Sequence, residues 1–170
     1  MAGVQTTLTD LEVEICKHVA RQRQADAERA GADPHKHGLA VEGGYIFHLN
    51  GCLREMAFAK IVNRYWTGAG LHWEEDDDVG GVQVRSTAHA NGHLIIRPDD
   101  EEVWDQIWAL VIGMDGGREY TYVGSILDQF TRIPEFWGAK DPSRPPCWWI
   151  PQDALTPPKG GYYERRVAPR

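Results

Sequence analysis

The N-terminal part of the chain shows apolar residues at helical spacing. Over residues 8–30 they recur every three or four positions, and Thr9 or Asp10 can cap the first turn. Beyond Ala20 the sequence is almost entirely polar, which predicts that the second half of this helix is exposed to solvent. The pattern therefore predicts one long amphipathic helix near the N-terminus.

A second helix is predicted over Gly51–Tyr65, with Asn50 as its cap. On this helix Glu55 falls on a largely apolar face. A carboxylate in such a place costs free energy unless it is paired, hydrogen-bonded or bound to a metal ion. Glu55 is thus the first residue whose position suggests a function.

From residue 71 onward the periodicity changes to that of β-strands. Five runs are predicted as strands: Leu71–Val79, Val82–Thr87, His93–Arg97, Ile107–Gly113 and Tyr120–Ile126. The run at 107–113 is apolar throughout, as is typical of a strand buried on both faces. Asp99–Asp105 is predicted as a short acidic helix or turn. This order of elements predicts an α/β protein with a mixed central sheet flanked by helices.

The C-terminal region is rich in Pro and Trp. Residues 127–155 are predicted to wrap around the core on four aromatic anchors: Phe136, Trp137, Trp148 and Trp149. Residues 156–170 are predicted to form a flexible basic tail. The 170 residues fit a single domain, in which residues 1–50 form the N-terminal helix and loop and residues 51–126 form the core.

The composition indicates which cellular environment and which partners to expect. A net charge of −7 counts against a protein that simply coats nucleic acid, because non-specific affinity comes mainly from Lys and Arg. The three cysteines, Cys16, Cys52 and Cys147, lack CxxC spacing, which favours a reducing compartment. No run approaches the roughly 18 apolar residues that span a bilayer, and no signal-peptide pattern begins the chain. We therefore expect a cytoplasmic protein without a membrane partner.

Gly80 and Gly81 stand between two strand-like runs, which is a signal for a two-residue hairpin turn. The register of such a hairpin opposes Val79 with Val82, Asp78 with Gln83, and Asp76 with Arg85. Opposed residues point to the same face of the sheet. The four polar side chains of these pairs are therefore predicted to form one polar patch.

This patch, together with Glu55, has the groups that phosphodiester hydrolysis needs. Carboxylate oxygens of Glu55 and Asp78 can bind Mg²⁺ or Mn²⁺, and the Gln83 side-chain oxygen can complete the protein ligands. A bound metal ion lowers the pKa of its water and offsets the charge that develops on the phosphorane. Arg85 can hold a phosphate oxygen with its fork of donors.

A simpler interpretation of the hairpin is structural. The acidic run at 74–78 is then a solvated loop, and Arg85 pairs with Asp76. On this interpretation the hairpin alone carries no chemistry. The hypothesis of a site gains weight because Glu55 precedes the hairpin on a helix.

The order of these residues is similar to that of the PD-(D/E)XK nucleases, namely a helical Glu, then Asp, then (Glu/Gln)-x-(Lys/Arg). Glu55, Asp78, and the pair Gln83 and Arg85 would fill these places. The resemblance implies a restriction endonuclease-like core, to which this chain adds the N-terminal helix and the C-terminal wrap. It also implies DNA as the substrate, Mg²⁺ or Mn²⁺ as the cofactor, and these four residues as catalytic, with Glu55, Asp78 and Gln83 as metal ligands.

Further residues are candidates for supporting roles at such a site. Lys60, one helical turn past Glu55, joins Arg85 as a candidate for substrate binding. Asp76 and Ser86 are secondary candidates on the two sides of the hairpin.

Most of the chain also resembles a group of small proteins carried by phages and found in environmental sequences. The matching segments are LTDLEVEICKHVARQRQ, GCLREMAFAK, DVGGVQVRST, GHLIIRPDD, ALVIG, VGSI and CWWIPQDAL. This resemblance implies a phage-encoded protein that acts in the cytoplasm of the host cell.

Two positions depart from the nuclease pattern. Gln83 replaces the usual acid, which removes a negative charge and weakens metal binding. Arg85 replaces the usual Lys and stays protonated, so it cannot act as a general base. An alternative therefore stays open, in which an inactive nuclease-like protein binds a host defence factor or another protein through an acidic surface. A virion or assembly component is a third hypothesis, and a homodimer is compatible with each of them.

Overall fold

The computed structural model describes residues 3–31, 44–68, 78–140 and 145–158. Helix α1 spans Asp10–Arg29, and Thr9 caps it as predicted. The Thr9 hydroxyl accepts the Glu12 backbone N–H at 3.3 Å, and the Glu12 carboxylate accepts the Thr9 backbone N–H at 2.6 Å. This reciprocal capping box satisfies two backbone donors that the helix leaves unpaired, and so fixes its start.

Helix α2 spans Gly44–Ile61, so the prediction that Asn50 caps a helix starting at Gly51 is wrong. Asn50 lies inside the helix and is buried. Its side-chain oxygen accepts the backbone N–H of Gly116 at 2.9 Å. The Asn50 side chain thus makes a long-range contact to the turn after another strand. The helix begins about two turns earlier than predicted.

A four-stranded mixed sheet has the order β1-β5-β4-β2. The strands are β1 Val4–Thr7, β2 Val82–Thr87, β4 Ile107–Ile112 and β5 Glu119–Leu127. Strands β2 and β4 are parallel, whereas β5 runs antiparallel to both β4 and β1. The mixed sheet is as predicted, except that β1 was not foreseen.

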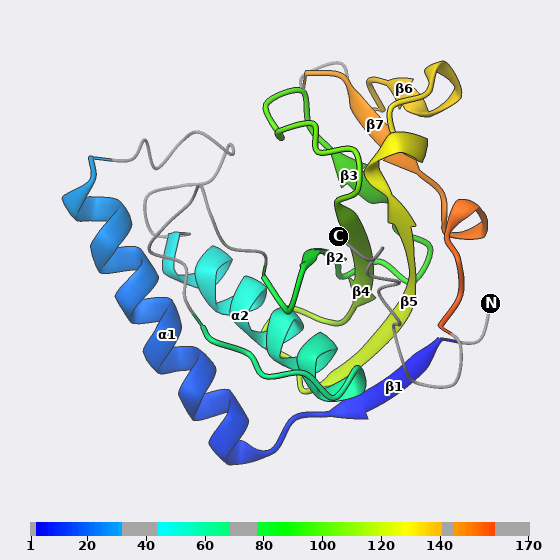
Figure 1. Ribbon diagram of the computed structural model, residues 1–170. Helices are drawn as coiled ribbons and strands as arrows, with labels where there is room; N and C mark the ends of the chain where they lie inside the picture. The colour runs from blue at the N-terminus through cyan, green and yellow to red at the C-terminus, as the bar shows by residue number, and fades with distance from the viewer. Residues whose placement is uncertain (1–2, 32–43, 69–77, 141–144, 159–170) are drawn as a thin grey trace, which may run out of the picture.

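The two faces of this sheet are covered by different elements (Figure 1). Both helices pack on one face, here called the helix face, where they enclose a core with Val82, Val84 and Tyr122. The other face, here called the far face, packs against a second sheet of order β3-β7-β6. Its strands are β3 Leu94–Ile96, β6 Trp137–Gly138 and β7 Cys147–Ile150. The sheet is therefore flanked by helices on one face only, and the predicted C-terminal wrap takes the form of a small sheet.

Strand β4 separates the two cores by simple alternation. Ile107, Ala109 and Val111 belong to the helix-face core, whereas Trp108 and Leu110 belong to the far-face core. This confirms that the apolar run is buried on both faces.

Residues 71–77 of the predicted strand Leu71–Val79 lie outside the described residues, and Val79 forms a single bridge to Val82. The acidic segment Asp99–Asp105, predicted as a short helix or turn, contains turns. In the described part of the chain, no helix is long and apolar enough to cross a membrane.

Candidate functional site

The hairpin that starts β2 has the predicted geometry. Val79 and Val82 exchange two backbone hydrogen bonds of 3.1 Å. Gly80 and Gly81 both have positive φ, +54° and +91°, which a two-residue turn of this kind requires. The register of the hairpin therefore places Asp78 at the entrance of β2.

Glu55 is held on α2 by two partners that the sequence patterns did not indicate. Arg23 of α1 donates to both carboxylate oxygens, at 2.8 and 2.7 Å. The indole N–H of Trp66 donates to one of them at 3.0 Å. The Glu55 side chain is only 8% exposed. Its predicted need for a partner is thus met by a bidentate ion pair, which is the strongest geometry that Arg offers.

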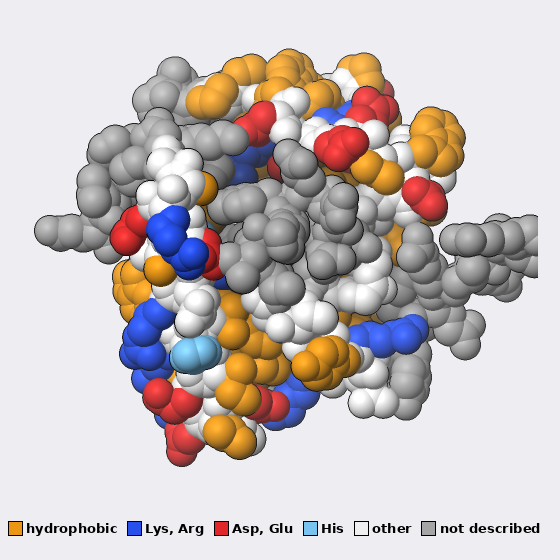
Figure 2. All heavy atoms as spheres, turned by 60° about the vertical axis from the view of Figure 1, so that its left-hand side comes forward, with side chains coloured by type: hydrophobic (Ala, Val, Ile, Leu, Met, Phe, Trp, Pro, Cys, Tyr) orange, Lys and Arg blue, Asp and Glu red, His pale blue; other side chains and the backbone are white. Residues whose placement is uncertain are grey.

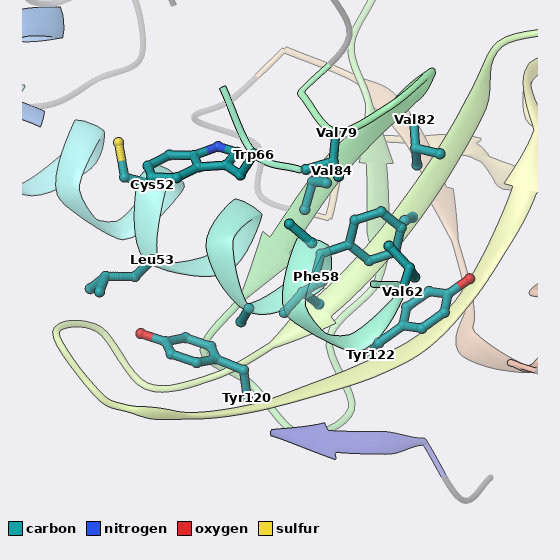
Figure 3. Packing of buried hydrophobic residues seen from close by; sticks show 14 of the residues in the cluster. Cys52, Leu53, Phe58, Val62, Trp66, Val79, Val82, Val84, Tyr120 and Tyr122 are labelled. Carbon is teal, nitrogen blue, oxygen red and sulfur yellow. The ribbon is translucent and has the colours of Figure 1, made fainter. Parts of the chain in front are cut away.

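Trp66 follows α2 and lies at the rim of the helix-face core, near Val79 and Val84 (Figure 3). Its N–H orients the Glu55 carboxylate. Arg23, in contrast, comes from the half of α1 that was predicted to be solvent-exposed. That prediction is wrong at Arg23, whose side chain is 13% exposed.

Asp78 lies where the edge of the sheet meets this ion pair. Its carboxylate accepts the backbone N–H of Val84 at 2.7 Å. Because β2 is the edge strand beside β4, this bond satisfies a donor that has no strand partner. Asp78 therefore has a structural role in addition to any chemical one.

Burial and the charge of Glu55 both act on the ionisation of Asp78. Desolvation by burial, followed by the charge of Glu55, raises the pKa of Asp78 to about 7. The Val84 N–H bond and the positive charges of Arg85 and Arg23 act in the opposite direction and are outweighed. An acid whose pKa is raised by both burial and a neighbouring carboxylate is a candidate for a functional group.

Gln83 and Arg85 do not join these two carboxylates on the helix face. Val82 and Val84 pack into the helix-face core, so Gln83 and Arg85 alternate to the far face. Arg85 forms an ion pair of 2.7 Å with Asp100, and its guanidinium lies 4.5 Å from the ring centroid of Trp108. The positive charge of Arg85 thus acts on Asp78, whereas its direct contacts are with Asp100 and Trp108.

The supporting candidates are dispersed. Lys60 donates to the Thr7 carbonyl at 3.0 Å and to Glu12 at 2.8 Å, at the start of α1. Ser86 is exposed on β2. Asp76, with its predicted pairing with Arg85, lies outside the described residues.

The donors at this site suit a hard divalent cation. The charge of Glu55 raises the pKa of Asp78, and a bound Mg²⁺ or Mn²⁺ would favour the ionised form of Asp78. Mg²⁺ commonly uses only one or two carboxylates plus water. Within the described ranges, no group of three or more His, Cys, Asp or Glu side chains is placed to hold a metal ion. The site thus offers Glu55 and Asp78, with Arg23 as a competing cation.

Comparisons of the chain with protein-family models, with curated proteins and with solved structures give no match. What bears on function is therefore the arrangement of Glu55, Asp78 and Arg23. The charge of Glu55 acts on Asp78, whereas Gln83 and the direct contacts of Arg85 lie on the far face.

Proposed function

We propose that this chain is a metal-dependent phosphodiesterase acting on DNA, with a site of PD-(D/E)XK type centred on Glu55 and Asp78. The observation that carries the proposal is the electrostatic coupling of these two carboxylates, which raises the pKa of Asp78 to about 7. A divalent cation bound between two such carboxylates would offset their negative charges. The proposal extends to a phage-encoded protein that acts in the cytoplasm of its host.

In this proposal Glu55 and Asp78 hold Mg²⁺ or Mn²⁺, and Trp66 keeps the Glu55 carboxylate oriented through its N–H bond of 3.0 Å. The bound ion would supply an activated water and offset the charge on the phosphorane. Arg85 stays protonated, so its part is to add positive potential beside Asp78, with no proton transfer. Gln83 faces away from the pair and is not needed as a ligand.

Arg23 must release Glu55, at least in part, when a cation binds. Its guanidinium occupies both oxygens of the carboxylate. The arginine therefore acts as an internal counter-ion that keeps a buried acid stable while no metal ion is present. We expect metal affinity to be modest for this reason, because each binding event displaces an existing ion pair.

The face shown in Figure 2 carries Lys and Arg side chains interspersed with Asp and Glu along α1. Phosphate contacts supply most of the non-specific affinity for DNA, and neighbouring acids reduce it. We therefore expect weak, strongly salt-dependent DNA binding.

The test is cleavage of supercoiled plasmid DNA in Mg²⁺ or Mn²⁺, with chelator as the blank. Asp78→Asn and Glu55→Gln should each lower the rate at least a hundredfold, because each removes a ligand charge. Asp115→Asn is the matched control, since Asp115 is a largely exposed acid paired with Arg54 elsewhere. Cleavage that persists in both Asp78→Asn and Glu55→Gln would contradict the proposal.

A second candidate function is a catalytically inactive nuclease-like protein that binds another protein. The observation in its favour is that Glu55 already has all its strong partners, Arg23 and Trp66, within the fold. Arg85 likewise has a full ion pair with Asp100. Absence of both cleavage and Mn²⁺ binding in the purified protein would favour this candidate over the phosphodiesterase.

A further inference from the structure

Large apolar side chains are exposed on two turns at the edge of the far face. Trp104 is 69% exposed and Phe130 is 56% exposed, and Val103 beside Trp104 is also exposed. Exposed Trp and Phe are costly in a surface that contacts only water, and Trp is the side chain most enriched at binding hot spots. These residues therefore mark a surface that is worth testing for a partner.

The two turns are joined to each other by one backbone hydrogen bond and by the Arg132 side chain. The Asp128 backbone N–H donates to the Gln106 carbonyl at 2.9 Å. Arg132 donates from one nitrogen to the carbonyls of Asp100 and Glu101, at 3.0 and 3.1 Å. Segments 100–106 and 128–132 are thus tied at both ends into one surface, here called the Trp104 surface.

Buried polar groups beneath the Trp104 surface hold it in place. Asp128 is fully buried and accepts the indole N–H of Trp108 at 2.8 Å and the Thr131 hydroxyl at 3.2 Å. Asp100 is held by the Arg85 ion pair of 2.7 Å and by the Arg97 backbone N–H, also at 2.7 Å. Because the turns are already ordered, a partner would lose little free energy in ordering them on binding.

The rim of the Trp104 surface is acidic. Glu101, Glu102 and Asp105 are all exposed beside Val103 and Trp104. Among the described residues, Glu101 and Glu102 have no ion pair with a basic side chain. An apolar centre with an acidic rim is complementary to a partner with an apolar anchor and surrounding Lys or Arg.

We propose that the Trp104 surface docks a basic segment of a partner protein, with Trp104 as its main anchor and Glu101 and Glu102 as its charge contacts. The docking is independent of the phosphodiesterase proposal, since Glu55 and Asp78 lie on the other side of β2. Two other occupants fit less well. The acidic rim repels anionic lipid headgroups, and a second copy carries the same net charge of −7.

The probe is a synthetic 14-residue peptide with Leu and Lys at helical spacing, and its counterpart has Glu in place of Lys. Binding is measured by fluorescence anisotropy at low salt and again at high salt. We expect the Lys peptide to bind, and Trp104→Ala to weaken it at least about tenfold, as truncation of a central Trp does at hot spots. Reversal of the rim charge in Glu101→Lys with Glu102→Lys should weaken it similarly, as should added salt.

Leu11→Ala is the matched control, because Leu11 of α1 is 70% exposed at a different place and should not affect binding. Thermal unfolding of each variant shows whether the fold is kept, and Trp104→Ala should keep it because the side chain is mostly exposed. Equal binding of the Glu peptide, unchanged binding by Trp104→Ala, or an equal loss with Leu11→Ala would overturn the proposal. So would sedimentation equilibrium that shows a dimer lost in Trp104→Ala, since the occupant would then be a second copy.

Discussion

At the scale of single residues, Glu55 shows how a buried acid is made stable. Its carboxylate receives three hydrogen bonds, two from Arg23 and one from Trp66. Removing only one partner of such a pair leaves the other charge buried and uncompensated, which costs more than the pair contributes.

Arg23→Met should therefore lower the free energy of unfolding by about 3 kcal/mol in metal-free buffer. Urea unfolding followed by circular dichroism measures this. Arg29→Met on the same helix is the control, because Arg29 is 73% exposed and its ion pair with Asp26 contributes little. Equal stabilities for the two variants would show that Arg23 is not needed to balance Glu55.

The raised pKa of Asp78 makes stability depend on pH in a definite direction. Between pH 4 and 7 the folded protein keeps a proton on Asp78 that the unfolded chain has lost, so the free energy of unfolding falls as pH rises. A shift from 3.8 to about 7 corresponds to at most about 4 kcal/mol. The cost of the ionised group is complete above pH 7 and absent below pH 4.

Asp78→Asn keeps an oxygen for the Val84 N–H but cannot ionise. Relative to the parent protein it should gain stability steadily from pH 4 to pH 7, without metal ions, in urea unfolding at several pH values. Two parallel stability curves would mean that Asp78 titrates near its ordinary pKa.

The sequence predicted that Glu55 needs a partner, but not which one. Arg23 stands in a polar stretch whose pattern is that of an exposed helix end. Its burial depends on α1 packing along α2, a long-range contact that periodicity within α1 does not contain. Gln83 and Arg85 were placed with Asp78 because opposed hairpin residues share a face, yet the Asp78 carboxylate turns to the Val84 N–H at the edge of the strand.

At the scale of elements, the β2 hairpin was the feature best foreseen. Two consecutive glycines permit positive φ at both turn positions, and that fixes the register of Val79 with Val82. Strands β4 and β5 were also predicted, because their apolar residues indicate buried strands. Strand β1 was missed since the sequence VQTT is short and mostly polar, and it becomes a strand by pairing with β5.

Gly81→Ala should destabilise the protein by about 1–2 kcal/mol, because a Cβ is strained at positive φ. Gly138→Ala is the control, since no described atom lies within 4 Å of an added Cβ there and its φ is not positive. The two midpoints of urea unfolding give the comparison. A Gly81→Ala variant as stable as Gly138→Ala would mean that the turn adopts another conformation.

At the scale of the whole molecule, two sheets pack face to face through a hydrophobic core, and an ion pair also joins them. Arg85 of the first sheet pairs with Asp100, which follows β3 of the second. Strand β3 itself pairs with β7, more than fifty residues later. Pairings over such distances leave no local pattern, so the second sheet could not be predicted, although the aromatic residues of the C-terminal segment indicated that it covers the core.

Arg85→Met should lower the free energy of unfolding by about 2 kcal/mol, because it leaves Asp100 half-buried without its cation. Arg118→Met is the control, since Arg118 forms a more exposed ion pair with Asp10. If both variants unfold at the same urea concentration, the ion pair of Arg85 with Asp100 does not help to hold the two sheets together.

The central claim is that Glu55 and Asp78 together form a divalent cation site. Calorimetric titration of the purified protein with MnCl₂ tests it most directly, with Asp78→Asn and Glu55→Gln as ligand variants and Asp115→Asn as control. We predict one site in the parent protein and in the control, tighter in Arg23→Met, and lost in both ligand variants. Binding that is absent from the parent and from Arg23→Met, or that is unchanged in both ligand variants, would contradict the claim.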